Sequence, residues 1–354
     1  MAEEEEKPFK PPCKADAFDA VGLYPELDKD FTKFLQRTTF DSQSEESLIR
    51  PMPLPGPQDW LSRFPTDPES FEKWESREER NEVVVGKNTI YILPIGEFSE
   101  QTRVEEHATG KHSGVTDPFL AELLEYAEIF FFGLPIKMLP RVPVESLNAT
   151  TRNYEVARGV KRDQLQTKEI FLFLLHMLPR DAYCVLAITM MDLYPDRRWN
   201  FVFGQASTRD RIGVFSFARN HPDFFSAGKV VSLDKLSEVS VLAKQLMTWR
   251  SCNILTHEIT HMFGLEHCVY FSCLMNGRNH EEESDRSGSF LCPVCLHKMQ
   301  HAIGFDFVAR YKTMLAFYES RLATVDEDST EEDRYKKCYN WLQKALKLIQ
   351  ECQT

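Results

Sequence analysis

The segment 256–268, THEITHMFGLEHC, gathers three histidines, a glutamate, a glycine and a cysteine in one short stretch. On an α-helix, side chains four positions apart lie about 40° apart around the axis and about 6 Å along it, so His257 and His261 share a face. Zinc bonds imidazole nitrogens at about 2.0–2.1 Å, so its ligand atoms must converge. A continuous helix would carry His267 about 15 Å along the axis from His257, which is out of reach. The chain must therefore turn before His267.

Gly264 is the residue at which we expect this turn, because glycine adopts the left-handed conformation that ends helices at little steric cost. His267 can then return as a third protein ligand. Three protein ligands leave a fourth position for water, which is the arrangement of a catalytic zinc site. Glu258 directly follows the first histidine, so we expect its carboxylate beside that water as general base. The pattern predicts a hydrolytic zinc centre.

A second set of potential metal ligands begins directly after the third histidine. Cys268 and Cys273 form one pair, and CPVC supplies Cys292 and Cys295. Neighbouring side chains in an extended segment point to opposite sides, so Cys268 is not expected to share an ion with His267. Four thiolates in two close pairs are typical of a closed tetrahedral zinc site. We expect this second zinc to be structural and to hold the polar loop between the pairs.

The other histidines and cysteines lack such spacing, and two sets of residues are interpreted on that ground. Structural or surface roles are expected for His107, His112, His176, His221 and His280. Burial is expected for most of Cys13, Cys184, Cys252, Cys338 and Cys352. Met275, two residues after Cys273, suits either core packing or a hydrophobic base beneath the zinc ligands.

Hydrophobic periodicity indicates the elements that must position these residues. Runs rich in β-branched and aromatic residues predict strands, and apolar residues three and four apart predict helices. Strands are expected at 88–96 and in three runs between 183 and 219. Helices are expected at 117–131, at 168–178 as a buried helix, from about Ser237 to Gly264, at 302–322 and at 335–350, with an acidic linker at 325–333.

The aromatic run GVFSFAR, at 213–219, allows two interpretations. An exposed edge strand at this position would pair with an extended substrate through main-chain hydrogen bonds. A strand rich in aromatic residues also suits the core of a sheet. The sequence leaves both open.

Composition restricts the class of protein. The 354 residues are 42% hydrophobic and 12% aromatic, which is enough to fill a core. The net charge of −12 disfavours a nucleic-acid surface. The start of the chain lacks the pattern of a secretory signal, and the apolar runs are too short to cross a bilayer. We expect a soluble intracellular monomer, cytoplasmic or nuclear, in which cysteines stay reduced and bind metal or are buried.

Taken together, H-E-x-x-H-x-x-G-x-x-H-C, Cys273, Met275 and CPVC resemble the archaemetzincins, a family of the metzincin clan of zinc peptidases. The motif match covers 257–295, and MDLYPDRRWNFVFGQAS and GVFSFAR extend a looser likeness upstream. The resemblance implies an α+β, zincin-like metalloprotease fold. Such a fold has a twisted mixed β-sheet with backing helices, a substrate cleft below its edge strand, and a small C-terminal subdomain that holds the four-cysteine zinc site.

The resemblance also implies a role for each motif residue. Glu258 is the general base and acid, and Met275 forms the family's methionine turn. The catalytic zinc ligands are His257, His261 and His267, and the structural zinc ligands are Cys268, Cys273, Cys292 and Cys295. Related metzincins with a Tyr soon after the turn methionine can use it at the metal, but MNGRN offers none. Charge on the scissile carbonyl oxygen then falls mainly to the zinc.

The motifs also suggest a division of the chain. Residues 1–85, rich in Pro and charge, are expected to form an irregular N-terminal arm. An archaemetzincin-like peptidase domain would span 86–322, with an upper subdomain at 86–266 and a lower one at 267–322. An acidic linker and a C-terminal helix would occupy 323–354.

The leading hypothesis is a metallopeptidase with two zinc ions per chain, one catalytic and one structural. It would act on a peptide or protein substrate, with no nucleic acid or membrane as partner, and either as aminopeptidase or as endopeptidase. The alternative is a zinc-stabilised protein- or nucleic-acid-binding module with a vestigial peptidase site. An intact Glu258 beside intact ligands favours the enzyme, because a binding role does not require that carboxylate.

Overall fold

The computed structural model describes residues 9–41, 47–78, 80–98, 115, 117–228, 241–323 and 334–353. These residues divide into two compact units. Unit 1 comprises Met1–Arg80, Phe263–Leu315 and Cys338–Thr354, and unit 2 comprises Asn81–Met262 and Ala316–Lys337. Helices α10 (Phe307–Leu322) and α11 (Arg334–Gln353) contribute residues to both. No helix in these ranges is long and apolar enough to cross a membrane. His107, His112 and the acidic linker at 325–333 lie outside the described residues.

Unit 2 is built on a five-stranded mixed sheet with the order β2-β1-β5-β8-β7. All neighbouring strands are parallel except β7, which runs antiparallel to β8. The strands are β1 (Thr89–Ile95), β2 (Ile136–Met138), β5 (Ala182–Thr189), β7 (Gly204–Ser207) and β8 (Ile212–Ser216). Every residue of β1 and β5 is buried, as a central strand covered on both faces requires. This confirms the mixed sheet that the resemblance implied.

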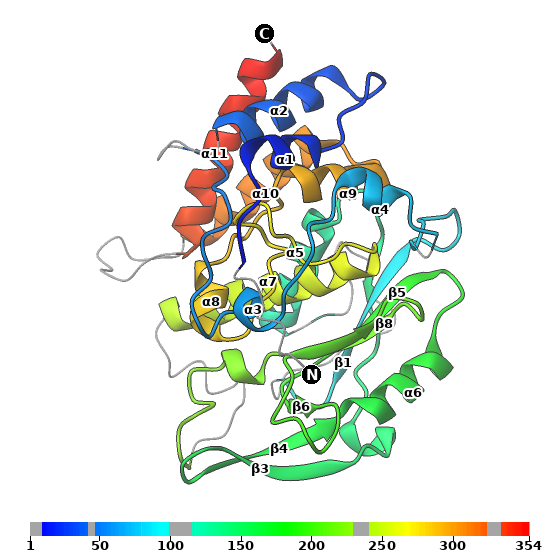
Figure 1. Cartoon of the computed structure of the whole chain (residues 1–354). Helices are drawn as coiled ribbons and strands as arrows, with labels where there is room; N and C mark the ends of the chain where they lie inside the picture. The colour runs from blue at the N-terminus through cyan, green and yellow to red at the C-terminus, as the bar shows by residue number, and fades with distance from the viewer. Residues whose placement is uncertain are drawn as a thin grey trace, which may run out of the picture. The chain divides into compact units, whose positions relative to one another are not determined.

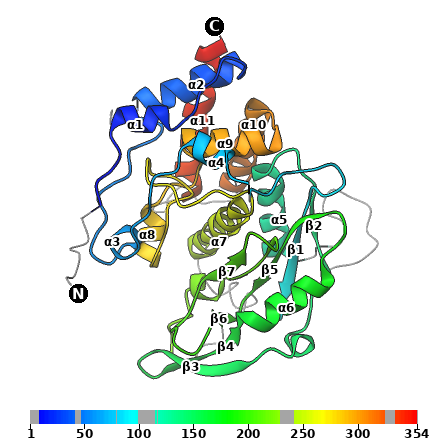
Figure 2. The same ribbon diagram turned by 45° about the vertical axis from the view of Figure 1, so that its right-hand side comes forward.

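Helices lie on both faces of this sheet. Helix α6 (Thr167–Met177) lies on one face, and α5 (Pro118–Phe130) and α7 (Val241–Met262) lie on the other (Figures 1 and 2). Helix α5 begins where the sequence predicts, because the Asp117 carboxylate accepts hydrogen bonds from the backbone N–H groups of Phe119 and Leu120 at 2.9 and 3.1 Å.

The helix at 168–178, expected to be buried, is buried on one side only. Ile170 and Leu174 of α6 are buried in the core with the sheet residues, but Leu172 is 50% exposed and Leu175 is 46% exposed. A helix on the outer face of a sheet buries only the side turned toward the strands. The apolar run therefore predicted the helix correctly and its environment incorrectly.

GVFSFAR supplies β8, and the edge-strand interpretation of this run is wrong. Strand β8 pairs with β5 on one side and with β7 on the other, and all its residues are buried. The core interpretation is therefore confirmed. Gly204 of β7 is opposite Phe215, and a Cβ at Gly204 would lie 1.9 Å from the Phe215 ring. Only glycine allows that ring to cover the neighbouring strand.

A second sheet of unit 2 was not predicted. It has the order β3-β4-β6, formed by β3 (Thr151–Ala157), β4 (Val160–Gln166) and β6 (Asp192–Tyr194). Its first two strands are a hairpin whose turn contains Gly159 at φ 74°. No residue of β3 is buried and the hairpin sequence is mostly polar, so it lacks the hydrophobic pattern of a strand. Short 3₁₀ helices occupy Val144–Leu147 and Ala218–Asn220.

The regular structure described in unit 1 is helical, and its N-terminal part, expected from the sequence to be an irregular arm, carries four helices joined by irregular segments. Besides parts of α10 and α11 it contains α1 (Lys14–Asp19), α2 (Lys29–Phe40), α3 (Trp60–Arg63), α4 (Phe71–Glu75), α8 (Glu281–Arg286) and α9 (Pro293–Ile303). Phe31, Phe71 and Trp74 are at most 2% exposed. The ring of Phe71 stacks on His297 of α9 at 3.9 Å. Aromatic side chains at irregular intervals thus form a core that periodicity does not reveal.

One of the two helices expected near the C-terminus is interrupted, and the expected domain limits differ from the unit boundaries. The helix expected at 302–322 is interrupted at Gly304, where φ is 76°, so α9 ends at Ile303 and α10 begins at Phe307. The C-terminal helix expected at 335–350 is present as α11. The predicted domain limits after 85, 266 and 322 do not coincide with the unit boundaries after Arg80, Met262 and Leu315, so that division stays a prediction.

The buried ion pair of unit 2 leads to a stability prediction. Arg219 donates to both carboxylate oxygens of Asp192 at 2.8 and 2.9 Å, and the two side chains are 8% and 0% exposed. Asp192→Ala leaves the guanidinium buried without its partner and should lower the free energy of unfolding by about 3–5 kcal/mol. Urea denaturation measures this. Asp196→Ala removes the exposed pair with Arg198 and should leave the midpoint unchanged; equal shifts would contradict the prediction.

Candidate metal centres

The histidine pair of unit 2 has the geometry of a shared ion. Helix α7 places His257 and His261 one turn apart, with their Nε2 atoms 3.0 Å from each other and their rings at 85°. Two nitrogens on one tetrahedral zinc lie about 3.3 Å apart when each bond is about 2.0–2.1 Å. His257 is 6% exposed, and His261 and the intervening Glu258 are half-buried. The pair therefore fits zinc with little adjustment.

The end of α7 follows the sequence prediction. The helix stops at Met262, whose carbonyl oxygen accepts hydrogen bonds from the Tyr183 hydroxyl at 3.1 Å and the Asn81 amide at 2.9 Å. Gly264 then adopts φ 78°, the left-handed conformation expected of it. His267 belongs to unit 1, where its half-buried ring packs edge-on against Trp60 with the ring centroids 4.9 Å apart. The role of His267 as third ligand stays a prediction.

The four motif cysteines come together in unit 1. Cys268, Cys273, Cys292 and Cys295 are at most 6% exposed, and their sulfur atoms all lie within 4.8 Å of one another. The Sγ atoms of Cys268 and Cys292 are 3.6 Å apart, whereas two thiolates on one tetrahedral zinc lie about 3.8 Å apart for bonds of about 2.3 Å. All four are free thiols. The set matches a closed four-cysteine zinc site in ligand type, number and spacing.

The surroundings of the four cysteines include donors to sulfur, but they do not favour the charged form equally. The backbone N–H groups of Met275 and Cys292 donate to Cys273 Sγ at 3.4 and 3.3 Å. Cys292 is the N-cap of α9 and Cys295 lies in its first turn, where the helix dipole stabilises negative charge. Hydrogen bonds from the other three thiols lower the pKa of Cys268 well below its usual range. Burial raises the pKa of Cys292, and the hydrogen bond with Cys268 raises the pKa of Cys295, both well above the usual range, so without a cation the cluster concentrates its negative charge on Cys268. A cation at the centre would offset the remaining negative charge.

Asn276 holds the loop around this site, and the sequence did not single it out. Its side chain donates to the carbonyl oxygens of Cys268 and Phe271 at 2.8 and 2.9 Å, and accepts from the Cys273 N–H at 2.7 Å. Met275, which is fully buried, accepts from the Cys268 N–H at 2.7 Å through its carbonyl. The position of Asn276 directly after the turn methionine was the available signal, but a lone Asn in a polar loop carries no periodicity.

A third group with ligand-type atoms, Asp59, His280 and Glu283, is already satisfied by hydrogen bonds. Asp59 accepts from the Gly56 N–H, from His280 and from Arg286 at 2.8 to 3.0 Å. Glu283 accepts backbone N–H groups with both oxygens. A guanidinium on the same carboxylate disfavours a cation, so we assign this cluster a structural role. That agrees with the interpretation of His280 as structural.

Among the described residues, the other histidines and cysteines agree with the roles expected from the sequence. His176 is exposed and His221 is 2% exposed, which suits surface and structural roles. Burial is confirmed for Cys184, Cys252, Cys338 and Cys352. Cys13 is exposed, where its sulfur accepts from the Asp16 N–H at 3.4 Å as the N-cap of α1.

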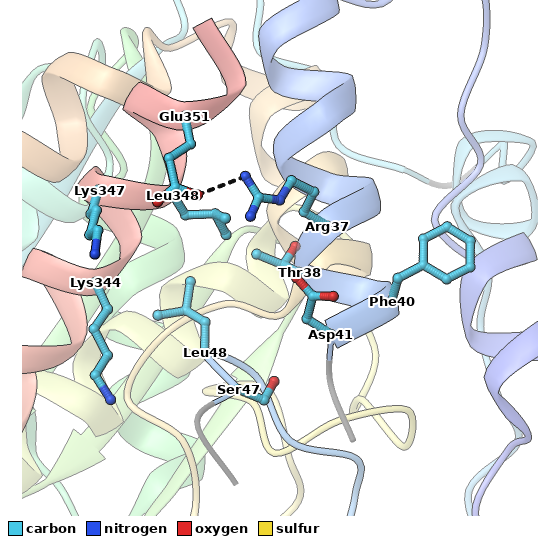
Figure 3. Close-up of a pocket in the computed structure, with 10 residues that line it drawn as sticks. All are labelled: Arg37, Thr38, Phe40, Asp41, Ser47, Leu48, Lys344, Lys347, Leu348 and Glu351. Atoms are coloured by element: carbon cyan, nitrogen blue, oxygen red, sulfur yellow. Dashed lines mark hydrogen bonds and ion pairs between the residues drawn. The ribbon is translucent and has the colours of Figure 1, made fainter. Parts of the chain in front are cut away.

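Unit 1 also contains a pocket of about 710 Å³ between α2 and α11 (Figure 3). The ion pair of Arg37 with Glu351, at 2.9 Å, and the side chains of Lys344 and Lys347 lie along it. No histidine or cysteine lines it, so we do not assign it the metal chemistry.

Comparisons of this chain with a family model and with curated proteins point to the same family. The model of Peptidase family M54 matches residues 180–301, which contain both the histidine and the cysteine motifs. Archaemetzincin-2 from Homo sapiens is 37% identical over 332 residues, covering 87% of this chain and 88% of that protein. Archaemetzincin-2 from Rattus norvegicus is 38% identical, with 85% and 82% covered. Archaemetzincin-1 from Mus musculus is 33% identical, with 73% of this chain and 51% of that protein covered.

Two solved structures are more distant. Archaemetzincin from Methanopyrus kandleri is 24% identical with a TM-score of 0.39, covering 63% of this chain and 99% of that one. A zinc-dependent peptidase from Methanocorpusculum labreanum is 19% identical with a TM-score of 0.40, covering 59% and 99%. These scores are too low to compare positions within the fold.

The site chemistry and the M54 match define the class, which is a zinc-dependent metallopeptidase. Identity above one third to archaemetzincin-2 across most of both chains then shows that this chain belongs to the archaemetzincin family. The resemblance seen in the motifs is confirmed, and so is the enzyme class.

Asn276 provides a test of how the cysteine loop is held. Asn276→Ala should lower the free energy of unfolding by on the order of 3 kcal/mol, because the buried carbonyl oxygens of Cys268 and Phe271 lose their donors. Chemical denaturation with the zinc content held constant measures the change. Asn153→Ala, which removes an exposed amide bonded to Asp163, is the control and should shift stability by less than about 0.5 kcal/mol. Equal losses of stability in the two variants would contradict a specific role of the Asn276 contacts in holding the loop.

Proposed function

We propose that peptide hydrolysis takes place at His257, His261 and His267, with Glu258 as general base and acid. The observation that carries this proposal is the 3.0 Å separation of the His257 and His261 Nε2 atoms on a helix that also carries Glu258 between them. The M54 match includes this segment. His267 follows the left-handed Gly264 closely enough in sequence for the chain to return it to the same ion.

In this mechanism the protein residues bind the metal and transfer protons. When bound, zinc acidifies a coordinated water and polarises the substrate carbonyl as a Lewis acid. Glu258 accepts a proton from the water as its oxygen attacks the carbonyl carbon, and returns that proton to the departing amine nitrogen. The scissile C–N bond breaks, so the products are a carboxylic acid and an amine, and the acid then gives its proton to the amine to leave a carboxylate and an ammonium ion. Glu258 ends in its starting state.

We propose that unit 1 carries a second, structural zinc at the four cysteines. The 3.6 Å separation of two of the buried sulfurs and the N–H donors to Cys273 support it. All four possible ligands are cysteines, which leaves no open coordination position for catalysis.

The finer aspects of function are also proposals. The charge of −12 argues against nucleic acid as partner, and nine free thiols suit a reducing cytoplasm or nucleus. We propose that the chain acts there as a monomer on peptides or proteins. Aminopeptidase and endopeptidase action share the chemistry above and differ in whether a free N-terminus is required. Matched peptides with free and acetylated N-termini distinguish the two modes.

Glu258 provides the central test of the mechanism. Glu258→Gln keeps the shape of the side chain but cannot accept the proton, so kcat should fall by about 10²–10⁴-fold while zinc content is unchanged. Cleavage of a diverse peptide library by mass spectrometry, with elemental analysis of the same samples, measures both. Glu319→Gln, at an exposed position of α10, is the matched control and should retain parental activity. Parental cleavage by the Glu258 variant would refute the proposed base.

Zinc stoichiometry tests the two sites separately. The purified parent should contain two zinc ions per chain. Replacing Cys292 and Cys295 together by Ser should remove one ion and lower the melting temperature, because those ligands hold the start of α9 to the preceding loop. His257→Ala should remove the other ion with little effect on the melting temperature. A parental count of one that does not change in the cysteine variant would disprove the structural zinc.

A further inference from the structure

We propose that Trp60 and Arg77, from the N-terminal part of unit 1, are positioning residues that hold His267 in the orientation needed to bind the catalytic zinc. No motif marks this part of the chain. Several of its contacts nevertheless reach the short turn 263–267 between the end of α7 and the third histidine. This inference rests on the proposed function, because it assumes that His267 is a ligand.

Trp60 contacts the histidine ring itself. The two rings are edge to face at 78°, with their centroids 4.9 Å apart. Such a contact restricts rotation of an imidazole whose nitrogen must point at a metal. The indole Nε1 is buried and has no hydrogen-bond partner among the described residues. The ring is therefore placed by its packing, and a phenyl ring should replace much of it.

The position of Trp60 is determined on several sides. Its backbone N–H donates to the buried carboxylate of Glu283 at 2.9 Å. Phe64 packs on one side of its ring at 4.4 Å. A Cβ at Gly277 would lie 2.3 Å from the indole, so the ring lies directly against that backbone. Gly277 lies two residues after Met275. Trp60 therefore contacts both ends of the segment 267–277.

Arg77 holds the backbone of the turn. Its guanidinium donates to the Gly264 carbonyl and to the Glu266 carboxylate, both at 2.9 Å, and also pairs with Glu69 at 2.6 Å. The carbonyl oxygens that follow a helix end have no partner within the helix, and a cation there is favourable. Trp74 satisfies the preceding carbonyl, because its indole N–H donates to the Phe263 oxygen at 3.0 Å.

The Arg77 contacts are anchored in the interior of unit 1. Glu69 forms a buried pair with Lys298 of α9 at 2.9 Å, and the two side chains are 5% and 3% exposed. The same carboxylate accepts the Glu266 N–H at 3.4 Å. The turn is thus tied to α9, the helix that begins at two of the four cysteines. Zinc affinity at the histidines should therefore depend on residues that do not bind the metal.

The test measures zinc affinity, not only turnover, in full-length protein whose cysteine site is loaded. Trp60→Ala and Arg77→Met should each raise the dissociation constant of zinc at the histidine site by about 10–100-fold. Trp60→Phe should restore most of the affinity. Competition with a chromogenic chelator gives the constants. The visible spectrum of Co²⁺ at the histidine site should change in Trp60→Ala and not in Trp60→Phe.

Controls separate positioning from general loss of stability. Trp341→Ala removes a half-buried indole that stacks on Phe290 elsewhere in unit 1, and Arg37→Met removes the ion pair with Glu351. Neither substitution should weaken zinc binding at the histidine site. If they weaken it as much as Trp60→Ala and Arg77→Met do, the effect is global and the proposal is overturned.

His267→Ala distinguishes the two levels of the argument. If it abolishes tight zinc binding while Trp60→Ala and Arg77→Met bind like the parent, the positioning role is refuted and the proposed function survives. If His267→Ala itself binds zinc like the parent, the third ligand is wrong and both proposals fail. Weakened binding in all three variants, with rescue by Trp60→Phe, is the supporting result.

Discussion

A single metal ion requires its ligand atoms to converge within about 4 Å, whereas a straight helix separates residues by about 1.5 Å for each position. The length and end of α7 follow from this constraint. The helix continues far enough to place His257 and His261 on one face, and it stops within two residues of the second histidine. Stopping there leaves backbone carbonyl oxygens without helical partners. Tyr183 and Asn81 satisfy one in unit 2, while Trp74 and Arg77 satisfy the next two in unit 1.

The cysteine site shows the same dependence on backbone polar groups. The zinc was expected to hold the polar loop between the cysteine pairs. That loop also has contacts of its own, because Glu283 accepts the Asn279 N–H and Arg278 donates to the carbonyl oxygens of Leu274 and Gly288. Asn276 holds the segment before it, through the backbone of Cys268, Phe271 and Cys273. Buried polar groups must be paired, and around helix α8 these partners include side chains. The proposed zinc would add a cross-link to a loop that already has an internal framework.

The sequence predicted what local chemistry determines. The Asp117 cap, the glycine at the end of α7, the largely apolar strands β1 and β5 and the two metal motifs were all recognisable, because each depends on residues close together in the chain. The packing environment of each helix and strand could not be recognised from the sequence. Whether α6 is covered, whether β8 lies at an edge and whether the hairpin of β3 and β4 forms all depend on which distant segment packs beside them. A one-dimensional pattern does not contain that information.

The N-terminal part of the chain illustrates the same limit for function. Trp60, Glu69, Trp74 and Arg77 are spaced irregularly, since each makes a separate contact and none repeats with the period of a helix or strand. They contact a turn and a ring that the motif places, so their identity is visible only once the chain is folded. The similarity to archaemetzincin-2 extends over 87% of this chain, well beyond the 180–301 segment that carries the motifs. In the proposal above, this segment positions His267 from the side and contributes no atom to the metal.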